Sequence, residues 1–215
     1  MTMTDQMIEA VKSGDSSKVG ELLNQDPELA SARNDRGESA VQQAQYRGHQ
    51  DILRTLLAMG AKLSAYEAAA VGDSEQVRRA ISEDPSLVNS YAPDGFYLLG
   101  LAAYFSHLEI VDLLLENGAD PNQAANNPMK VTAMHAAASA RQTAIVAKLL
   151  ARGADPNVRQ QGSWTPLHAA AANGKEDMVR LLLKHGADAG VLTDAGESAK
   201  DLAIREGHPG IAVLL

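Results

Sequence analysis

The sequence of 215 residues has no cysteine, few aromatic residues and no long hydrophobic run. Without cysteine there is no disulfide framework, no thiolate metal site and no cysteine nucleophile, which favours an intracellular protein. Aromatic residues number 2 Phe, 1 Trp and 5 Tyr, so small aliphatic side chains must fill most of the interior. No apolar run approaches the roughly 18 residues of a membrane span, and the first residues lack a signal-peptide pattern. We therefore expect a cytoplasmic protein that does not enter a membrane.

Basic charge is also scarce in this chain. The sequence has 19 Lys and Arg against 27 Asp and Glu, which gives a net charge of -8 and a pI of about 5.2. An acidic protein repels phosphate backbones and anionic lipid surfaces. We expect neither nucleic acid nor membrane among its partners.

Internal repetition is what the chain has in abundance. The segment 108–122 (LEIVDLLLENGADPN) recurs at 144–157 and again at 177–188, and Trp164 is followed by TPLHAAAANG at 165–174. These residues resemble the ankyrin repeat, which has a T-P-L-H start, a helix of small residues, a glycine, and a second helix that ends in G-A-D. The resemblance implies an all-α solenoid of about seven helix-turn-helix repeats, joined by short β-hairpin or turn fingertips.

The resemblance extends over the chain as a single ankyrin repeat domain, 1–215. Its repeats are expected at 1–33 (an N-terminal cap), 34–62, 63–91, 92–126, 127–159, 160–192 and 193–215 (a C-terminal cap). The Thr position of T-P-L-H is then expected at Asp5, Ser39, Leu63, Tyr97, Thr132, Thr165 and Ser198. Repeat three lacks its fingertip, because Gly60 to Lys62 run directly into Leu63. Whether that loss is functional or neutral stays open. We expect the junction of repeats two and three to be the weakest, so that residues 1–62 exchange amide hydrogens apart from residues 97–190.

The spacing of the apolar residues predicts the same fold independently of the family resemblance. Ile110, Val111, Leu114 and Leu115 fall at helical spacing, and one such helix is too small to bury its own stripe. Alanine-rich first helices let neighbouring repeats approach closely and share one continuous core. Such a core needs few aromatic residues.

The six histidines occupy positions that recur from one repeat to the next. His135 and His168 stand in the T-P-L-H slot, where the family's histidine makes structural hydrogen bonds. His49, His107 and His208 open second helices, and His185 adjoins a glycine at a helix end. No carboxylates converge on any of these histidines, and G-x-S-x-G, H-E-x-x-H and phosphate-loop motifs are absent. We predict no metal, no cofactor and no enzymatic activity. An enzyme or ligand site at the Gly60–Leu63 notch is a remote alternative.

The resemblance places partner binding on the fingertips and on the exposed residues of the first helices, which form a concave face. The residue types at these positions are informative, since aromatics and arginine anchor interfaces. Burying five aromatic side chains would remove about 750–1,250 Å² of surface, comparable to one side of a standard interface at about 800 Å². The candidate partner-binding residues are Tyr46, Arg47, Phe96, Tyr104, Phe105, Val131 and Trp164.

We therefore predict a non-catalytic protein-protein interaction module whose concave face, centred on repeats four to six, holds a segment of an unidentified partner protein. The net charge, with Glu38 and Glu197 at the rim, favours a neutral or basic segment. Homodimerisation through the same apolar patch, in a structural or assembly role, is the alternative. Tyr104 and Phe105 have a second interpretation, which is to cover the space left by the missing fingertip and by Gly100 in the histidine slot. The partner, pathway, organism and oligomeric state are not encoded in any motif.

Overall fold

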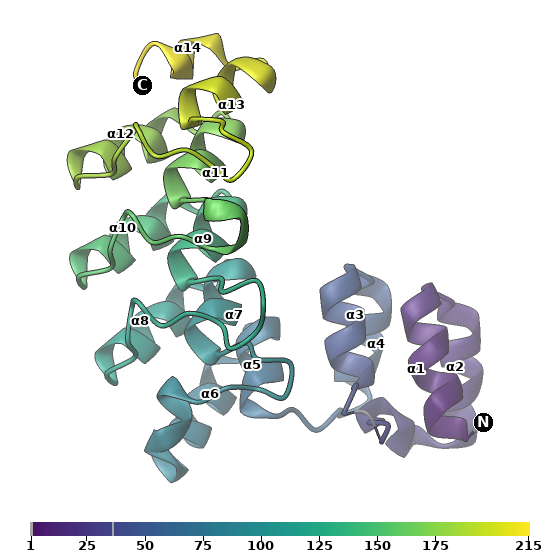
Figure 1. Cartoon of the computed structure of the whole chain (residues 1–215). Helices are drawn as coiled ribbons and strands as arrows, with labels where there is room; N and C mark the ends of the chain where they lie inside the picture. Colours follow the sequence, from purple (N-terminus) through teal and green to yellow (C-terminus); the bar gives the residue numbers. More distant parts are fainter. Residues whose placement is uncertain (1, 36) are drawn as a thin grey trace. The chain divides into compact units, whose positions relative to one another are not determined.

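The structure, a computed structural model, describes residues 2–35 and 37–215. Within these residues the chain forms pairs of short helices joined by turns (Figure 1). In chain order the helices are α1 (Met3–Ser13), α2 (Ser16–Gln25), η1 (Pro27–Ser31), α3 (Ala40–Arg47), α4 (Gln50–Ala58), α5 (Ala65–Val71), α6 (Ser74–Glu83), η2 (Pro85–Asn89), α7 (Leu98–Tyr104), α8 (Leu108–Glu116), α9 (Ala133–Ser139), α10 (Thr143–Ala151), η3 (Gln161–Ser163), α11 (Pro166–Ala172), α12 (Glu176–Lys184), α13 (Ala199–Arg205) and α14 (Pro209–Ala212).

The chain divides into two compact units, Met1–Val71 (the N-terminal unit) and Gly72–Leu215 (the C-terminal unit). The boundary falls between α5 and α6, which are the two helices of the predicted third repeat. The expectation of one domain over 1–215 stays a prediction.

Repeats stack in register within the C-terminal unit. The first helices α7, α9, α11 and α13 form one column, and α6, α8, α10 and α12 form a second column beside it (Figure 1). The second helices contribute large aliphatic side chains such as Leu114 and Leu149, and the first helices contribute alanines such as Ala137 and Ala170, all fully buried. Because each helix pair buries its stripe against the next pair, the fold is the expected all-α repeat solenoid.

The turns between repeats are fingertips with almost no β structure. In the described residues they contain only isolated antiparallel bridges, Arg33 to Ser39, Ala124 to Thr132 and Leu192 to Ser198. The two Asp-Pro segments that replace G-A-D form η1 and η2 instead. Each begins with an aspartate, Asp26 or Asp84, whose carboxylate accepts a backbone N–H of the next turn.

The Thr position of T-P-L-H is the N-cap of the first helix. Ser39, Thr132, Thr165 and Ser198 each accept a backbone N–H through the side-chain oxygen.

Two of the seven predicted Thr positions are wrong. Helix α1 starts one turn earlier, with Thr2 as the cap and Asp5 as its partner in a capping box. Before α5 the capping residue is Ser64 and not Leu63. Only Ser64 has a side-chain oxygen, and this hydroxyl accepts the Glu67 N–H at 3.3 Å. Glu67 therefore occupies the histidine slot of repeat three.

Candidate partner-binding surface

Three of the predicted binding residues occupy equivalent places in successive turns of the C-terminal unit. The carbonyl oxygens of Phe96, Val131 and Trp164 each accept a hydrogen bond from the residue that opens the same turn. These donors are the backbone N–H groups of Ala92, Ala125 and Gln160, at 2.7, 2.9 and 3.0 Å. Each side chain is thus presented from a closed turn and not from a loose loop.

Neighbouring turns are bonded to one another through the backbone. The Asn126 N–H donates to Gly95 O at 2.8 Å, Gln161 N–H to Met129 O at 3.1 Å, and Asp194 N–H to Gly162 O at 2.9 Å. The turns 92–96, 125–131, 160–164 and 193–197, which we call the turn row, therefore form one continuous edge. They lie beside the first-helix column, on the side away from the second helices (Figure 1).

Trp164 is the best-positioned aromatic residue of the turn row. Its ring packs on His168 at a centroid distance of 5.8 Å, and the Gly162 Cα lies beneath it. The side chain is only half-buried, and among the described residues its indole N–H has no hydrogen-bond acceptor. A half-exposed indole with a free donor suits a hydrogen bond to a partner.

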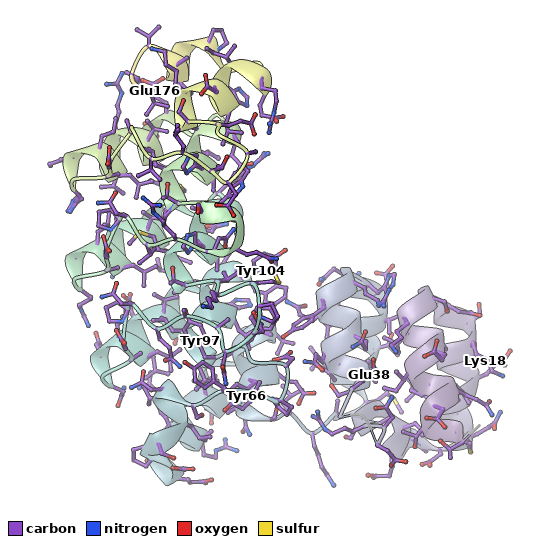
Figure 2. All side chains as sticks on the ribbon, in the orientation of Figure 1. Lys18, Glu38, Tyr66, Tyr97, Tyr104 and Glu176 are labelled. Atoms are coloured by element: carbon purple, nitrogen blue, oxygen red, sulfur yellow. The ribbon has the colours of Figure 1, made fainter. Side chains whose placement is uncertain are left out.

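Tyr104 and Phe105 form a second aromatic pair, at the end of α7. Their rings meet edge to face at 5.0 Å. Tyr104 is 54% exposed, and Figure 2 shows it on the side of the first-helix column away from α8. Phe105 is half-buried.

The space over Gly100 is filled by Tyr97 and not by Tyr104 or Phe105. A Cβ at Gly100 would lie 2.9 Å from Tyr97 Cε1. That part of the alternative interpretation of Tyr104 and Phe105 is therefore wrong. The sequence carried a signal for this arrangement, since Tyr97 and Gly100 depart together from the Thr and His of the motif.

Tyr97 performs the task that histidine performs in other repeats. Its ring is 1% exposed, and its hydroxyl donates to Gln123 O at 2.6 Å. In repeat six, His168 Nε2 donates to the equivalent carbonyl, Val191 O, at 3.1 Å. Burial raises the pKa of Tyr97, so its proton stays in this bond.

Tyr46 and Arg47 end helix α3 of the N-terminal unit. Both side chains are exposed, and Arg47 Nε donates to Gln43 Oε1 at 3.3 Å. They belong to the other compact unit, so the C-terminal unit presents the remaining five candidates: Phe96, Tyr104, Phe105, Val131 and Trp164.

His135 and His168 are buried and fully hydrogen-bonded. Nδ1 of each accepts the N–H of its capping threonine, at 3.4 Å for Thr132 and 3.1 Å for Thr165. Nε2 donates to a carbonyl of the following turn, and in His135 this carbonyl is Trp164 O at 3.1 Å. Burial lowers the pKa of His135 to about 4 and also lowers that of His168. These neutral rings hold the turns in place.

The histidines that open second helices pack on glycines of the preceding repeat. A Cβ on Gly14, Gly72 or Gly174 would come within 2.6–2.8 Å of the ring of His49, His107 or His208. The equivalent positions Ser106 and Arg141 also have positive φ, 71° and 62°. A side chain fits there because Gln142 and Lys175 replace histidine in the next repeat. These histidines are packing residues as well.

A charged cluster that the sequence reasoning missed lies in the N-terminal unit. The Glu67 carboxylate, 6% exposed, accepts from Arg33 Nη2 at 2.8 and 2.9 Å, from the Ser64 N–H at 2.8 Å and from the Ser39 hydroxyl. Gln45 Nε2 adds a bond to Ala70 O at 2.6 Å. The cluster joins α3 to α5 where the third fingertip is missing. Its acceptors are occupied by structural donors.

Metal-binding clusters are absent from residues 2–35 and 37–215. No group of three or more His, Asp or Glu side chains there could hold a metal ion. In the same described residues, every helix is too short or too polar to span a membrane.

Stacked helix pairs with a continuous row of turns define a repeat solenoid. A family model described as "Ankyrin repeats (3 copies)" matches residues 65–160 and 145–215, more than half of the chain. The protein belongs to the ankyrin repeat family. Members of this family are typically non-catalytic modules that bind other proteins.

A curated relative matches part of the chain. The E3 ubiquitin-protein ligase Ufd4 of Drosophila melanogaster is 38% identical over 95 residues, which are 44% of this chain and 3% of that protein. The chain therefore spans a very small part of that relative.

Proposed function

We propose that this protein is a non-catalytic module that binds another protein through the turn row and first helices of repeats four to six. The observation that carries the proposal is the set of incompletely buried rings, Phe96, Tyr104, Phe105 and Trp164, at positions that the alanine-rich core does not need. Hydrogen-bonded turns hold Phe96 and Trp164 before any partner arrives, which lowers the entropy lost on binding. Family membership supports the same function.

The test is affinity capture from native lysate with the wild-type protein and the variant Phe96→Ala/Tyr104→Ala/Trp164→Ala. We expect the variant to lose its partners, since aromatic hot spots contribute at least about 2 kcal/mol each. Circular dichroism confirms that the variant is folded, and Tyr66→Ala in α5 serves as a matched aromatic control. An unchanged set of captured proteins with a folded triple variant would contradict the proposal.

A second copy of this chain, bound through the same rings as a homodimer, is the competing occupant of this surface. Light scattering at tens of micromolar, about the range of weak dimers, separates the two. A wild-type dimer that becomes a monomer in the triple variant assigns the surface to self-association. A cytoplasmic location is also part of our proposal, supported by the absence of cysteine and tested by cell fractionation.

A further inference from the structure

The carboxylates that favoured a basic partner are neutralised within the protein. Glu38, labelled in Figure 2, lies 2.9 Å from Lys12 Nζ, and Glu197 forms an ion pair with Arg205. Their charges therefore add little to the field that a partner meets. The sign of the binding surface depends on the other charged groups of repeats four to six.

Those repeats distribute their charges unevenly between their two sides. The turns and first helices, residues 92–107, 123–141 and 157–174, contain the cations Lys130, Arg141 and Arg159 and one carboxylate, Asp94. All three cations are exposed. The second helices and the loops after them contain most of the carboxylates of these repeats: Glu109, Asp112, Glu116, Asp120, Asp155, Glu176, Asp177 and Asp188. They also contain five cations: Lys148, Arg152, Lys175, Arg180 and Lys184. Within repeats four to six the proposed binding side thus has more cations than carboxylates in an acidic protein. The next turn of the turn row contributes Asp194, whose carboxylate accepts the Ser163 hydroxyl at 2.6 Å.

The cations on the turn and first-helix side do not form ion pairs within the described part of the protein. In the part of the chain that the structure describes, none of the three has a carboxylate at ion-pair distance, and Arg141 Nε donates instead to the neutral Asn173 Oδ1 at 3.1 Å. On the second-helix side, Lys148 pairs with Asp112 and Arg180 with Glu176, both at 2.8 Å, whereas among the described residues Arg152 and Lys184 have no carboxylate at ion-pair distance. Unpaired cations are free to meet a partner's carboxylates.

Two of these cations adjoin the aromatic residues of the turn row. The bond from Gln161 N–H to Met129 O joins the turn of Lys130 to the turn of Trp164. Arg159 lies close enough to His168 to act on its charge, and His168 packs against Trp164. Met129, 49% exposed, adds an apolar side chain at the same place.

We propose that the turn row of repeats five and six binds an acidic segment of a partner protein, whose carboxylates meet Lys130, Arg141 and Arg159 while its apolar side chains contact Val131 and Trp164. This proposal deepens the proposed function and rests on it. A protein segment is favoured over nucleic acid, because three spaced cations beside half-buried rings, in a chain of net charge -8, suit a few carboxylates and not a dense polyanion.

The test uses three fluorescein-labelled peptides of equal length that share Leu and Phe positions and carry Glu, Gln or Lys at the others. Fluorescence anisotropy with the full chain measures their affinities at low and high salt. We expect the Glu peptide to bind about tenfold or more tightly than the Gln peptide, with an affinity that falls as salt rises. The proposal would be overturned if the Glu peptide bound no more tightly than the Lys peptide, or if the Glu peptide did not bind at all.

Charge-reversal variants locate the interaction. Lys130→Glu/Arg159→Glu is expected to weaken Glu-peptide binding about tenfold. Arg152→Glu/Lys184→Glu makes the same change in net charge at exposed sites on the second-helix side, and it should change the affinity by less than about threefold. Arg141→Gly removes a cation at a position whose positive φ suits glycine, so this variant should fold normally. A reduced affinity for the Glu peptide in this variant would therefore reflect the lost charge and not misfolding.

The outcomes separate this inference from the proposed function. Equal losses in the two charge-reversal variants would mean that only net charge matters, which would overturn the inference. If a single-stranded RNA of similar charge bound as tightly as the Glu peptide and lost affinity in Lys130→Glu/Arg159→Glu, the surface would be a nucleic-acid site. If Phe96→Ala/Tyr104→Ala/Trp164→Ala abolished binding while charge reversal had no effect, the proposed function would stand and the acidic partner would not.

Discussion

Repeat three of the N-terminal unit and repeats four to six of the C-terminal unit fix the start of their first helices with different chemistry. In the N-terminal unit the histidine slot of repeat three holds Glu67, a buried carboxylate bound to the guanidinium of Arg33. In repeats four to six the same task falls to neutral groups, the imidazoles of His135 and His168 and the phenol of Tyr97. The ion pair of Arg33 and Glu67 links two repeats where the fingertip is missing. Neutral donors suffice in repeats four to six, because the turn of the next repeat supplies a backbone carbonyl as acceptor. The two units should therefore respond differently to acid and to the loss of one side chain.

Acid should weaken the C-terminal unit most. Burial lowers the pKa of His135 from 6.5 to about 4, so between these values the unfolded chain binds a proton that the folded chain does not. Stability is present in full above pH 6.5 and falls as the pH drops through this window. The loss reaches about 3 kcal/mol at pH 4. Urea unfolding followed by the fluorescence of Trp164, the single tryptophan, measures it at a series of pH values.

Histidine variants isolate the groups responsible. His135→Gln should flatten part of the pH dependence, and His168, whose pKa burial also lowers, should account for a further part. His185→Gln is the matched control, since His185 is exposed in the loop after α12. A His135→Gln protein with an unaltered pH profile would show that this imidazole does not govern acid stability.

Removal of Glu67 should destabilise the N-terminal unit alone. Glu67→Ala deletes the acceptor of Arg33, Ser39 and Ser64. We expect a loss of about 2 kcal/mol, less than the roughly 3–5 kcal/mol for a fully buried pair, because the Arg33 side chain is 45% exposed. Amide hydrogen exchange should show faster opening of α3 and α5, with α9 and α11 unchanged. Glu28→Ala is the control, since Glu28 and Lys62 are both exposed and 4.0 Å apart.

The same exchange experiment tests where the chain opens. The sequence predicted separate opening of residues 1–62. The bonds from Arg33 to Glu67 and from Gln45 to Ala70 attach α5 to α3, so residues 65–71 should now exchange with the N-terminal unit. Uniform protection on both sides of Val71 would argue against two units.

Tyr97→Phe should have the smallest effect. The variant keeps the ring over Gly100 and removes only the hydrogen bond to Gln123 O, which should cost about 1–2 kcal/mol because the carbonyl is left unpaired. The double variant Tyr97→Thr/Gly100→His restores the motif and should be more stable than Gly100→His alone, in which the imidazole and the Tyr97 ring compete for one space. A double variant less stable than Gly100→His would mean that the two positions are not coupled.

Much of the fold was predictable because the repeat is local and periodic. Helical spacing of Ile110, Val111, Leu114 and Leu115 identified the second helices, and the glycines that end them adopt the expected left-handed conformation, with φ of 84° at Gly118. The helix starts at Thr2 and Ser64 were missed, because a cap is defined by which oxygen reaches a backbone N–H and not by repeat spacing. For the binding surface, the sequence predicted which residues occupy the turns and the ends of the first helices, whereas their exposure and the hydrogen bonds between turns depend on the packing of neighbouring repeats.

The sequence by itself determined the family, the order of the helices and the positions left free of the core, because each follows from a period of about 33 residues. Only the tertiary structure decided which charges are paired. Glu38 and Glu197 are neutralised by Lys12 and Arg205, and Lys130 and Arg159 are not neutralised, since ion pairing depends on distances between residues that spacing does not specify. The net charge of the chain and the sign of its proposed binding surface therefore differ.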